Sequence, residues 1–410
     1  MRKSFLLVAL AALLMLAGAV SAQDQVTITL MGHGSSTAEE AALRAQVDAF
    51  MAANPNIVVD LQIVPEYDTV IRTAFASGDY PEVFYVGQDA LDEFAQAGVL
   101  APAEDNVADV DDIFPSLVQT YTYDGVFYCP AKDFSNLALE YNVDMFDAAG
   151  VAYPTNDWTW EDLRAAAQQI TEATGVPGLV VNPDIDRWFS FYLQAGGTLY
   201  DEEGNFVFAS EGANYDAAVE AVTFFQELFA NGWAVTSQQT GAGWSGDAFG
   251  QGLAAMTMEG NWIIQYLIDT FPEVNWGAVQ LPAGMGGTEA TLTFSECYGV
   301  AADNEHPEES WALVNFLTGV EGAAALAEGG FGPMPTRLSS GDLWLESRGE
   351  LGTAFVEGAE FAVAPVLPPG FQEFRDTLGG NLQQVIEGSM TVEEAIEDAR
   401  DVADELIADM

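Results

Sequence analysis

Positive charge is scarce in this chain. Its 410 residues include 11 Lys and Arg against 63 Asp and Glu, and the formal net charge is -52. Such a polyanion is repelled by the phosphates of nucleic acids and by anionic membrane surfaces, so no nucleic acid and no lipid surface is expected as a partner. The composition is nevertheless 49% hydrophobic and 11% aromatic, which is too apolar for an intrinsically disordered protein. A chain of this length is expected to form two domains.

Histidine and cysteine are also rare, with two residues of each. His33 and His306 lie far apart and no HExxH sequence is present, so no metal site is expected. The chain contains neither a GxSxG sequence nor a P-loop. Gly241 to Gly246 matches GxGxxG literally, but no apolar strand precedes it, and we interpret this segment as a turn-rich loop. We therefore expect no cofactor.

Long apolar runs are absent after the N-terminus, where a single one begins. Arg2 and Lys3 precede an apolar run from Phe5 to Val20, which ends in the small-residue sequence Val20-Ser21-Ala22. This pattern is typical of a secretory signal peptide, and the run is shorter than the roughly 20 residues that span a bilayer. We expect residues 1–22 to be cleaved, with an uncleaved anchor as the alternative, and the mature protein to be periplasmic or secreted. No cysteine stands at the cleavage site, so no lipid anchor is expected.

Strand-like and helix-like segments alternate along the mature chain. Val26 to Leu30 and Ile57 to Val64 are predicted strands, and the segment between them has apolar residues at helical spacing. Pro81 to Val86 is a third predicted strand, between two predicted helices. This repetition of strand and helix indicates an α/β fold in which helices cover both faces of a parallel sheet.

Acidic residues are numerous enough to hide a catalytic pair. Two carboxylates at a suitable separation are sufficient for a glycoside hydrolase, and their separation cannot be recognised from a sequence. A secreted glycoside hydrolase is therefore one alternative function.

Several short motifs follow one another in a distinctive order. The first are PEVFYV, DGVFYCPAKDF and LALEYN, at residues 81–86, 124–134 and 137–142. They are followed by WTWEDL, MTMEGNW, WGAVQLP and GFGPMPTR, at residues 158–163, 256–262, 276–282 and 330–337. Each motif alone is weak, but their order resembles the extracellular solute-binding proteins of the maltose-binding type (family 1) over nearly the whole mature chain.

This resemblance implies a fold of two doubly wound α/β lobes that are joined by crossing strands, with a ligand-binding cleft between them. One lobe would comprise residues 23–131 and 299–337, and the other residues 134–296 and 338–410. The crossings would bring Cys129 and Cys297 together, although they lie far apart in the sequence. In an exported protein this arrangement predicts a disulfide, with two buried thiols as the alternative.

The resemblance also indicates which aromatic side chains would contact a ligand. A sugar presents apolar C–H faces that stack on aromatic rings, and its hydroxyl groups bond to carboxylates, amides and arginine. Trp262 matches the main stacking position, with Gly260 leaving room beside it. Trp188 matches a second aromatic position, although packing between elements is an equal alternative. Tyr85 and Gln88 follow the third strand, at the edge where open α/β sheets bind ligands.

Polar candidates follow from the same reasoning. Asp133 is the first choice among the carboxylates, and Lys132 beside it would either contact the ligand or neutralise Asp133. The remaining polar candidates lie after the first strand, in later loops or near the crossings, namely His33, Ser35, Ser36, Glu66, Ser295, Glu296 and Arg337. Val86 occupies a position where maltose binders carry a stacking tryptophan, which argues against maltodextrin itself and suggests a different or smaller glycoside.

These expectations combine into one function. The protein would bind a mono- or oligosaccharide outside the cytoplasm, as a monomer, and deliver it to the permease subunits of an ABC importer without catalysing a reaction. Capture of a polyamine or another cation by the same architecture is a second alternative, and four acids converging in the cleft would support it.

Overall fold

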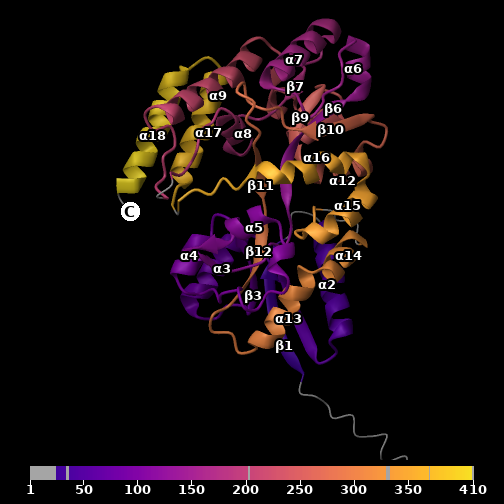
Figure 1. The fold of residues 1–410 in the computed structure, drawn as a ribbon, viewed down its shortest axis with the longest axis vertical. Helices are drawn as coiled ribbons and strands as arrows, with labels where there is room; N and C mark the ends of the chain where they lie inside the picture. Colours follow the sequence, from indigo (N-terminus) through magenta and orange to yellow (C-terminus); the bar gives the residue numbers. More distant parts are fainter. Residues whose placement is uncertain (1–24, 34–36, 202–203, 329–332, 369, 409–410) are drawn as a thin grey trace, which may run out of the picture.

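Two α/β lobes stand one above the other in Figure 1, the N-terminal lobe below and the C-terminal lobe above. The computed structural model describes residues 25–33, 37–201, 204–328, 333–368 and 370–408. The predicted signal peptide (1–22), Ser35 and Ser36 lie outside the described residues. Each lobe is built around its own sheet, and this two-lobe α/β architecture confirms the predicted fold class.

A four-stranded sheet in the order β12-β3-β1-β2 forms the centre of the N-terminal lobe. Its strands are β1 (Val26–Gly32), β2 (Ile57–Ile63), β3 (Val83–Gly87) and β12 (Glu296–Val300). β1 runs parallel to β2 and β3, as the alternation of strand and helix predicts, whereas β12 runs antiparallel to β3. The direction reverses because β12 enters this sheet from the other lobe.

Helices from both ends of the chain pack around this sheet. They are α2 (Thr37–Ala53), α3 (Tyr67–Ser77), α4 (Leu91–Gln96), α5 (Pro115–Thr120), α13 (Pro307–Leu317) and α14 (Val320–Glu328). The same lobe also holds the 3-10 turn η1 (Val110–Asp112) and a hairpin of β4 (Thr122–Tyr123) and β5 (Val126–Phe127). α13 begins at Pro307, which suits a first helical position because proline has no N–H to satisfy. α14 packs against α2, so the lobe is closed by a late segment of the chain.

A larger, mixed sheet forms the centre of the C-terminal lobe, in the order β13-β11-β6-β9-β7-β8, with β10 also paired to β6. Its strands are β6 (Ser135–Asn142), β7 (Leu179–Val180), β8 (Ala234–Val235), β9 (Met256–Gly260), β10 (Trp276–Gln280), β11 (Thr291–Phe294) and β13 (Ala362–Val363). β6 runs antiparallel to β9, β10 and β11, whereas β7 runs parallel to β8 and β9. The sequence predicted parallel pairing, and the central strand differs because it carries the chain in from the other lobe.

Six helices of the C-terminal lobe enclose a hydrophobic core that contains Trp160 and Trp188, namely α6 (Val143–Ala149), α7 (Trp160–Thr174), α8 (Ile185–Gln194), α9 (Ala213–Ala230), α17 (Gln372–Ile386) and α18 (Val392–Ala408). The buried residues of α11 (Ser245–Gly250), α12 (Trp262–Thr270), α15 (Gly341–Arg348) and α16 (Glu350–Gly358) belong instead to the cluster that also contains the core of the N-terminal lobe. The short elements α10 (Ser237–Thr240), η2 (Leu338–Ser340) and η3 (Ala359–Phe361) complete the lobe. None of the helices in the described ranges has the length and apolar character needed to cross a membrane.

Two segments cross between the lobes side by side. The backbone N–H of Lys132 donates to the carbonyl of Glu296 at 2.7 Å, and a disulfide joins the neighbouring residues Cys129 and Cys297, whose Cα atoms are 5.6 Å apart. Both cysteines are fully buried. The crossing is therefore held by backbone hydrogen bonds and by a covalent bond.

The positions of the strands suggest where one lobe ends and the other begins. β11 ends at Phe294 in the upper sheet and β12 begins at Glu296 in the lower one, so the chain returns at Ser295, a few residues before the expected position 299. We propose lobe boundaries within residues 131–134, at Ser295 and near residue 338, where η2 follows the last segment of the N-terminal lobe.

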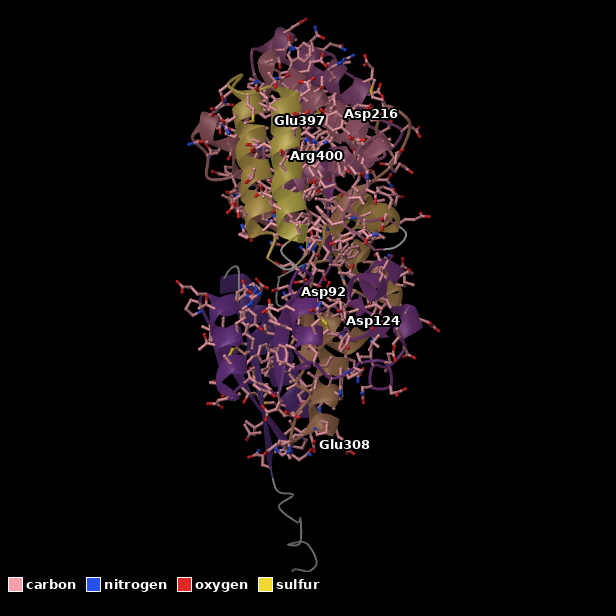
Figure 2. The ribbon with its side chains drawn as sticks, turned by 90° about the vertical axis from the view of Figure 1, so that its left-hand side faces the viewer. Asp92, Asp124, Asp216, Glu308, Glu397 and Arg400 are labelled. Atoms are coloured by element: carbon pink, nitrogen blue, oxygen red, sulfur yellow. A yellow bond between two sulfur atoms is a disulfide. The ribbon has the colours of Figure 1, made fainter. Side chains whose placement is uncertain are left out.

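The excess of negative charge is spread over both lobes. Figure 2 shows Asp216 and Glu397 on the upper lobe, and Asp92, Asp124 and Glu308 on the lower one. Solvent and salt screen much of the repulsion between charges that are exposed at the surface. The net charge of -52 is thus compatible with two compact lobes.

The buried disulfide generates a prediction about stability. Replacing both residues (Cys129→Ala with Cys297→Ala) should lower the free energy of unfolding by about 2–5 kcal/mol, because a bridge between distant residues restricts the unfolded chain. Urea unfolding measures this loss, and urea is preferable to guanidinium because it does not screen the charge of the protein. A reductant should destabilise the wild type and leave the double variant unchanged. Equal unfolding free energies for the two proteins would contradict the prediction.

Candidate functional site

A cavity of about 1100 Å³ lies between the two lobes, and we call it the interlobe cleft. The N-terminal lobe lines it with residues that follow β1 and β3, among them His33 and Gln88. The C-terminal lobe lines it with residues of α12 and of α17, among them Trp262 and Arg375. A cavity of this size, with a mixed apolar and polar lining, is suited to a small organic molecule.

Lys132 lies at the base of the cleft, where the chain crosses. Its ammonium group contacts the carboxylate of Asp133, lies 3.2 Å from that of Glu39 and 3.5 Å from that of Glu296, and stands 4.9 Å from the centre of the Tyr85 ring. The side chain is only 6% exposed. Burial alone would lower the pKa of Lys132, but the negative charge of Asp133 and its neighbours holds this pKa well above the ordinary value. Lys132 is therefore permanently charged.

We call Lys132 and its three carboxylates, Glu39, Asp133 and Glu296, the Lys132 cluster. Burying an ammonium ion is costly unless it is fully paired, and here the surrounding carboxylates supply the pairing. Burial also raises the pKa of Asp133 in spite of its contact with Lys132. Asp133 further accepts a hydrogen bond from the backbone N–H of Glu296, so it ties the two crossing segments together.

His33 extends the Lys132 cluster toward the opening of the cleft. Its Nε2 lies 2.7 Å from Oε1 of Glu296. This hydrogen bond raises the pKa of His33 although partial burial opposes the charge. Burial would raise the pKa of Glu296, but the hydrogen bond from His33 and the charge of Lys132 lower it below the ordinary value. The pair is thus a positively charged imidazole on a carboxylate at mildly acidic pH.

Trp262 begins α12 and stands in the cleft with 37% of its surface exposed. Its Nε1 donates to the carboxylate of Glu259 at 3.1 Å, and Arg187 holds the same carboxylate at 2.6 Å. A Cβ on Gly260 would lie 2.1 Å from the indole, so only glycine leaves room for the ring there. Phe294 supports the ring edge-on at 5.4 Å between centroids. The indole is therefore fixed in orientation although it is exposed.

The structure brings seven of the predicted site residues together in the interlobe cleft. Four of them, Lys132, Asp133, Ser295 and Glu296, come from the crossing segments. The other three, His33, Gln88 and Trp262, come from both lobes. The hydroxyl group of Ser295 donates to the carbonyl of Asp133 at 2.7 Å, so Ser295 also links the crossing segments.

Two predicted aromatic residues lie outside the cleft. Trp188 is fully buried in the core of the C-terminal lobe and stacks on Tyr192, because α8 turns this position inward, whereas its neighbour Arg187 pairs with Glu259 and lies 5.8 Å from the centre of the Trp262 ring. Tyr85 is also buried, and its ring lies beneath Lys132 and beside His33. The predicted ligand contacts of Trp188 and Tyr85 are therefore wrong, and Tyr85 instead supports the Lys132 cluster.

Two predicted polar residues also lie outside the cleft lining. Arg337 is buried in the N-terminal lobe, where its guanidinium donates to the carbonyls of Ala108, Asp109 and Thr318. Glu66 is exposed at the start of α3 with a left-handed backbone. The prediction for Arg337 is wrong, because its guanidinium joins loops inside the lobe. Glu66 precedes α3 and does not line the cavity, so its ligand contact stays a prediction.

Other residues of the cleft were not predicted. α12 places Trp262, Gln265, Tyr266 and Asp269 on one face, and all four line the cleft. Positions three, four and seven residues apart share a helix face, so this spacing could have indicated the last three residues once the helix start was known. Trp244 gave no such signal, because it lies in the segment that we interpreted as a turn-rich loop.

Two ion pairs complete the lining on the side of α17. Arg72 lies 2.9 Å from Glu93 within the N-terminal lobe, and Arg375 lies 2.7 Å from Asp186 within the C-terminal lobe. Each pair joins side chains of one lobe, so neither pair links the two lobes.

Two α/β lobes with a ligand-sized cavity at their junction form the architecture of a solute-binding protein. The chain belongs to the bacterial extracellular solute-binding protein family, whose model matches residues 34–324. Members of this family serve ABC transporters and are not enzymes. The glycoside hydrolase interpretation is therefore wrong.

Individual proteins of similar sequence or structure show the same relationship to this family. A protein of Brucella abortus (strain 2308) is 23% identical over 375 residues, which cover 88% of each chain. An ABC substrate-binding protein of Listeria monocytogenes in complex with cycloalternan is 25% identical, with a TM-score of 0.80 over 94% of this chain and 100% of that one. The sugar-binding protein MalE from Xanthomonas citri is 24% identical, with a TM-score of 0.81 over 94% and 98%.

The pair of His33 and Glu296 generates a prediction about pH. The pKa of His33 is raised above its ordinary value of 6.5, so the pair stabilises the folded state below that pH, and the contribution is lost as the pH rises through the folded-state pKa. The stabilisation of the folded state by this pair is also lost at acidic pH, where Glu296 becomes protonated. The variant Glu296→Gln should lower the pKa of His33, measured by NMR titration of the two histidine rings and assigned with His306→Gln. An unchanged pKa of His33 in Glu296→Gln would contradict this coupling.

Proposed function

We propose that the protein captures a neutral carbohydrate in the interlobe cleft and delivers it to an ABC importer. The observation that carries this proposal is the exposed and rigidly held indole of Trp262 in a cavity lined with carboxylates and amides. A pyranose ring has apolar C–H faces that stack on such an indole, and its hydroxyl groups at the edge accept and donate hydrogen bonds. The cycloalternan in complex with the Listeria protein supports a ligand of this class, as does the description of the Xanthomonas protein as sugar-binding.

The two sides of the cleft suggest how binding would drive closure. The upper side provides Trp262, and the lower side provides His33 and Gln88, whose Oε1 is buried without a hydrogen-bond partner among the described residues. A ligand that touches both sides binds the closed arrangement more tightly than the open one, and only such a difference shifts the equilibrium between them. The closed form of a monomer would then be the form that the permease subunits recognise, outside the cytoplasm after cleavage of residues 1–22.

The charges of the cleft favour a neutral ligand over a cation. Seven carboxylates line the cavity, but five of them already pair with cationic side chains of the protein. Three of these five surround Lys132, so their charge is already paired with a cation of the protein. The convergence of acids that would support polyamine capture is therefore directed at a residue of the protein itself.

Removal of the stacking ring tests the proposed function. The variant Trp262→Ala should weaken binding of the cognate sugar by about 30-fold or more, because a central aromatic contact is worth about 2 kcal/mol or more. A thermal-shift screen with neutral mono- and oligosaccharides, and with spermidine, identifies the ligand, and calorimetry then measures its Kd. Trp233→Ala is a matched control, because Trp233 is a half-buried indole of the same lobe outside the cleft lining. A response to spermidine alone, or unchanged affinity in Trp262→Ala, would overturn the proposal.

The balance of charges also predicts discrimination against acidic sugars. Seven carboxylates against Lys132, Arg72 and Arg375 leave the cleft negative, so a uronic acid should bind at least about ten-fold more weakly than the neutral sugar of the same shape. The methyl ester of the same uronic acid is the matched control and should recover the affinity. Added salt should reduce the difference, because it screens exposed charges. Equal affinities for the acid and its ester would contradict the prediction.

A further inference from the structure

A second pair of aromatic rings lines the cleft beyond Trp262. Trp244 stands at the start of α11 and Tyr266 lies on α12, and their ring centroids are 4.9 Å apart at an interplanar angle of 63°. Both residues line the cavity and are half-buried. They are therefore accessible from the cleft and are not part of the core.

The rings of Trp244 and Tyr266 are held in place in the same way as the indole of Trp262. A Cβ on Gly246 would lie 2.2 Å from the indole of Trp244, just as a Cβ on Gly260 would meet the indole of Trp262. The hydroxyl group of Tyr266 donates to the carboxylate of Asp247 at 2.9 Å. Each tryptophan thus lies over a glycine and against a second ring, so both indoles are presented to the cavity in a fixed orientation.

The spacing of the two aromatic positions matches a chain of sugars. Trp262 and Tyr266 are four residues apart on α12, which is about one helical turn, or about 5.4 Å along the axis. This rise is comparable to the length of one sugar unit. The first position adjoins the crossing, since the side chain of Asn261 donates to the carbonyl of Phe134 at 3.0 Å. The second position lies farther along α12, away from the crossing.

Polar groups between the two aromatic positions are also oriented. Gln265 accepts a hydrogen bond from Arg348 of α15 at 2.7 Å and donates one to Asp269 at 2.9 Å. Figure 1 shows α12 and α15 together at the edge of the upper lobe that faces the lower one. The amide of Gln265 and the carboxylate of Asp269 are thus available at fixed positions along the same face of α12, where they can bond to sugar hydroxyls.

We propose that Trp244 and Tyr266 form a second sugar-stacking position, and that the cleft takes a neutral oligosaccharide of two or more units laid along α12 from the crossing outward. This inference rests on the proposed function and specifies the length of its ligand. A cavity of about 1100 Å³ has room for such a chain. A monosaccharide would occupy only the position at Trp262.

Ladders of neutral oligosaccharides test this inference. Gluco-, manno- and xylo-oligosaccharides, each from the monosaccharide to the pentasaccharide, are titrated into the full-length protein by calorimetry. In Trp244→Ala the factor by which Kd increases should grow with chain length and reach about ten-fold or more for the trisaccharide. Trp244→Phe should retain more affinity than Trp244→Leu, because phenylalanine keeps a ring face and leucine does not.

The outcomes separate this inference from the proposed function. Trp262→Ala should lose affinity at every length, and Trp233→Ala should bind every sugar as the wild type does. If no ladder binds to the wild type, the proposed function fails. If a ladder binds and Trp262→Ala weakens it, but the Trp244 variants lose no affinity or lose the same factor at every length, the second stacking position is overturned while the function stands. The comparison of Trp244→Phe with Trp244→Leu decides the question if Trp244→Ala does not fold.

Discussion

The burial of Lys132 at the crossing is the interaction on which the rest of the structure depends. Only this lysine remains after the predicted signal peptide, and it is enclosed by Asp133, Glu39 and Glu296 from three separate segments. A buried ammonium ion requires full pairing, so these segments cannot move independently without leaving charges unpaired. The cluster therefore fixes the base of the cleft, from which both lobes and His33 take their positions.

The two sides of the cleft differ in chemistry because they come from different kinds of element. The C-terminal lobe presents aromatic rings from the starts of α11 and α12, and Gly246 and Gly260 make room for their indoles. The N-terminal lobe presents His33 and Gln88 from the ends of its strands. With the proposed function, the C-terminal lobe would provide the stacking surface and the polar groups of α12, and the N-terminal lobe would provide further hydrogen bonds, so a ligand would have its full set of contacts only when the lobes lie together.

The sequence predicted the fold more accurately than it predicted the contacts of individual residues. The ordered motifs from residue 81 to residue 337 indicate the two-lobe family correctly. Residues next to the crossings, such as Asp133 and Glu296, could be placed in the cleft because the crossing strands determine their position. Trp188 could not be assigned in this way, since the rotation of α8 decides which of its side chains turn into the core. Tyr85 was misplaced for the same reason, because successive positions of a strand point to opposite faces of its sheet.

The sequence by itself determined the family, the alternation of strands and helices, and the strongly negative charge, because these properties depend on composition and on local order along the chain. Only the tertiary structure decided which side chains meet. Trp244 and Tyr266 lie far from Asp133 and Glu296 in the sequence, yet all four line one cavity. The physical reason is that a binding cleft between two lobes consists of contacts between distant segments, and local patterns carry no information about the rotation of a helix or the distance across a junction.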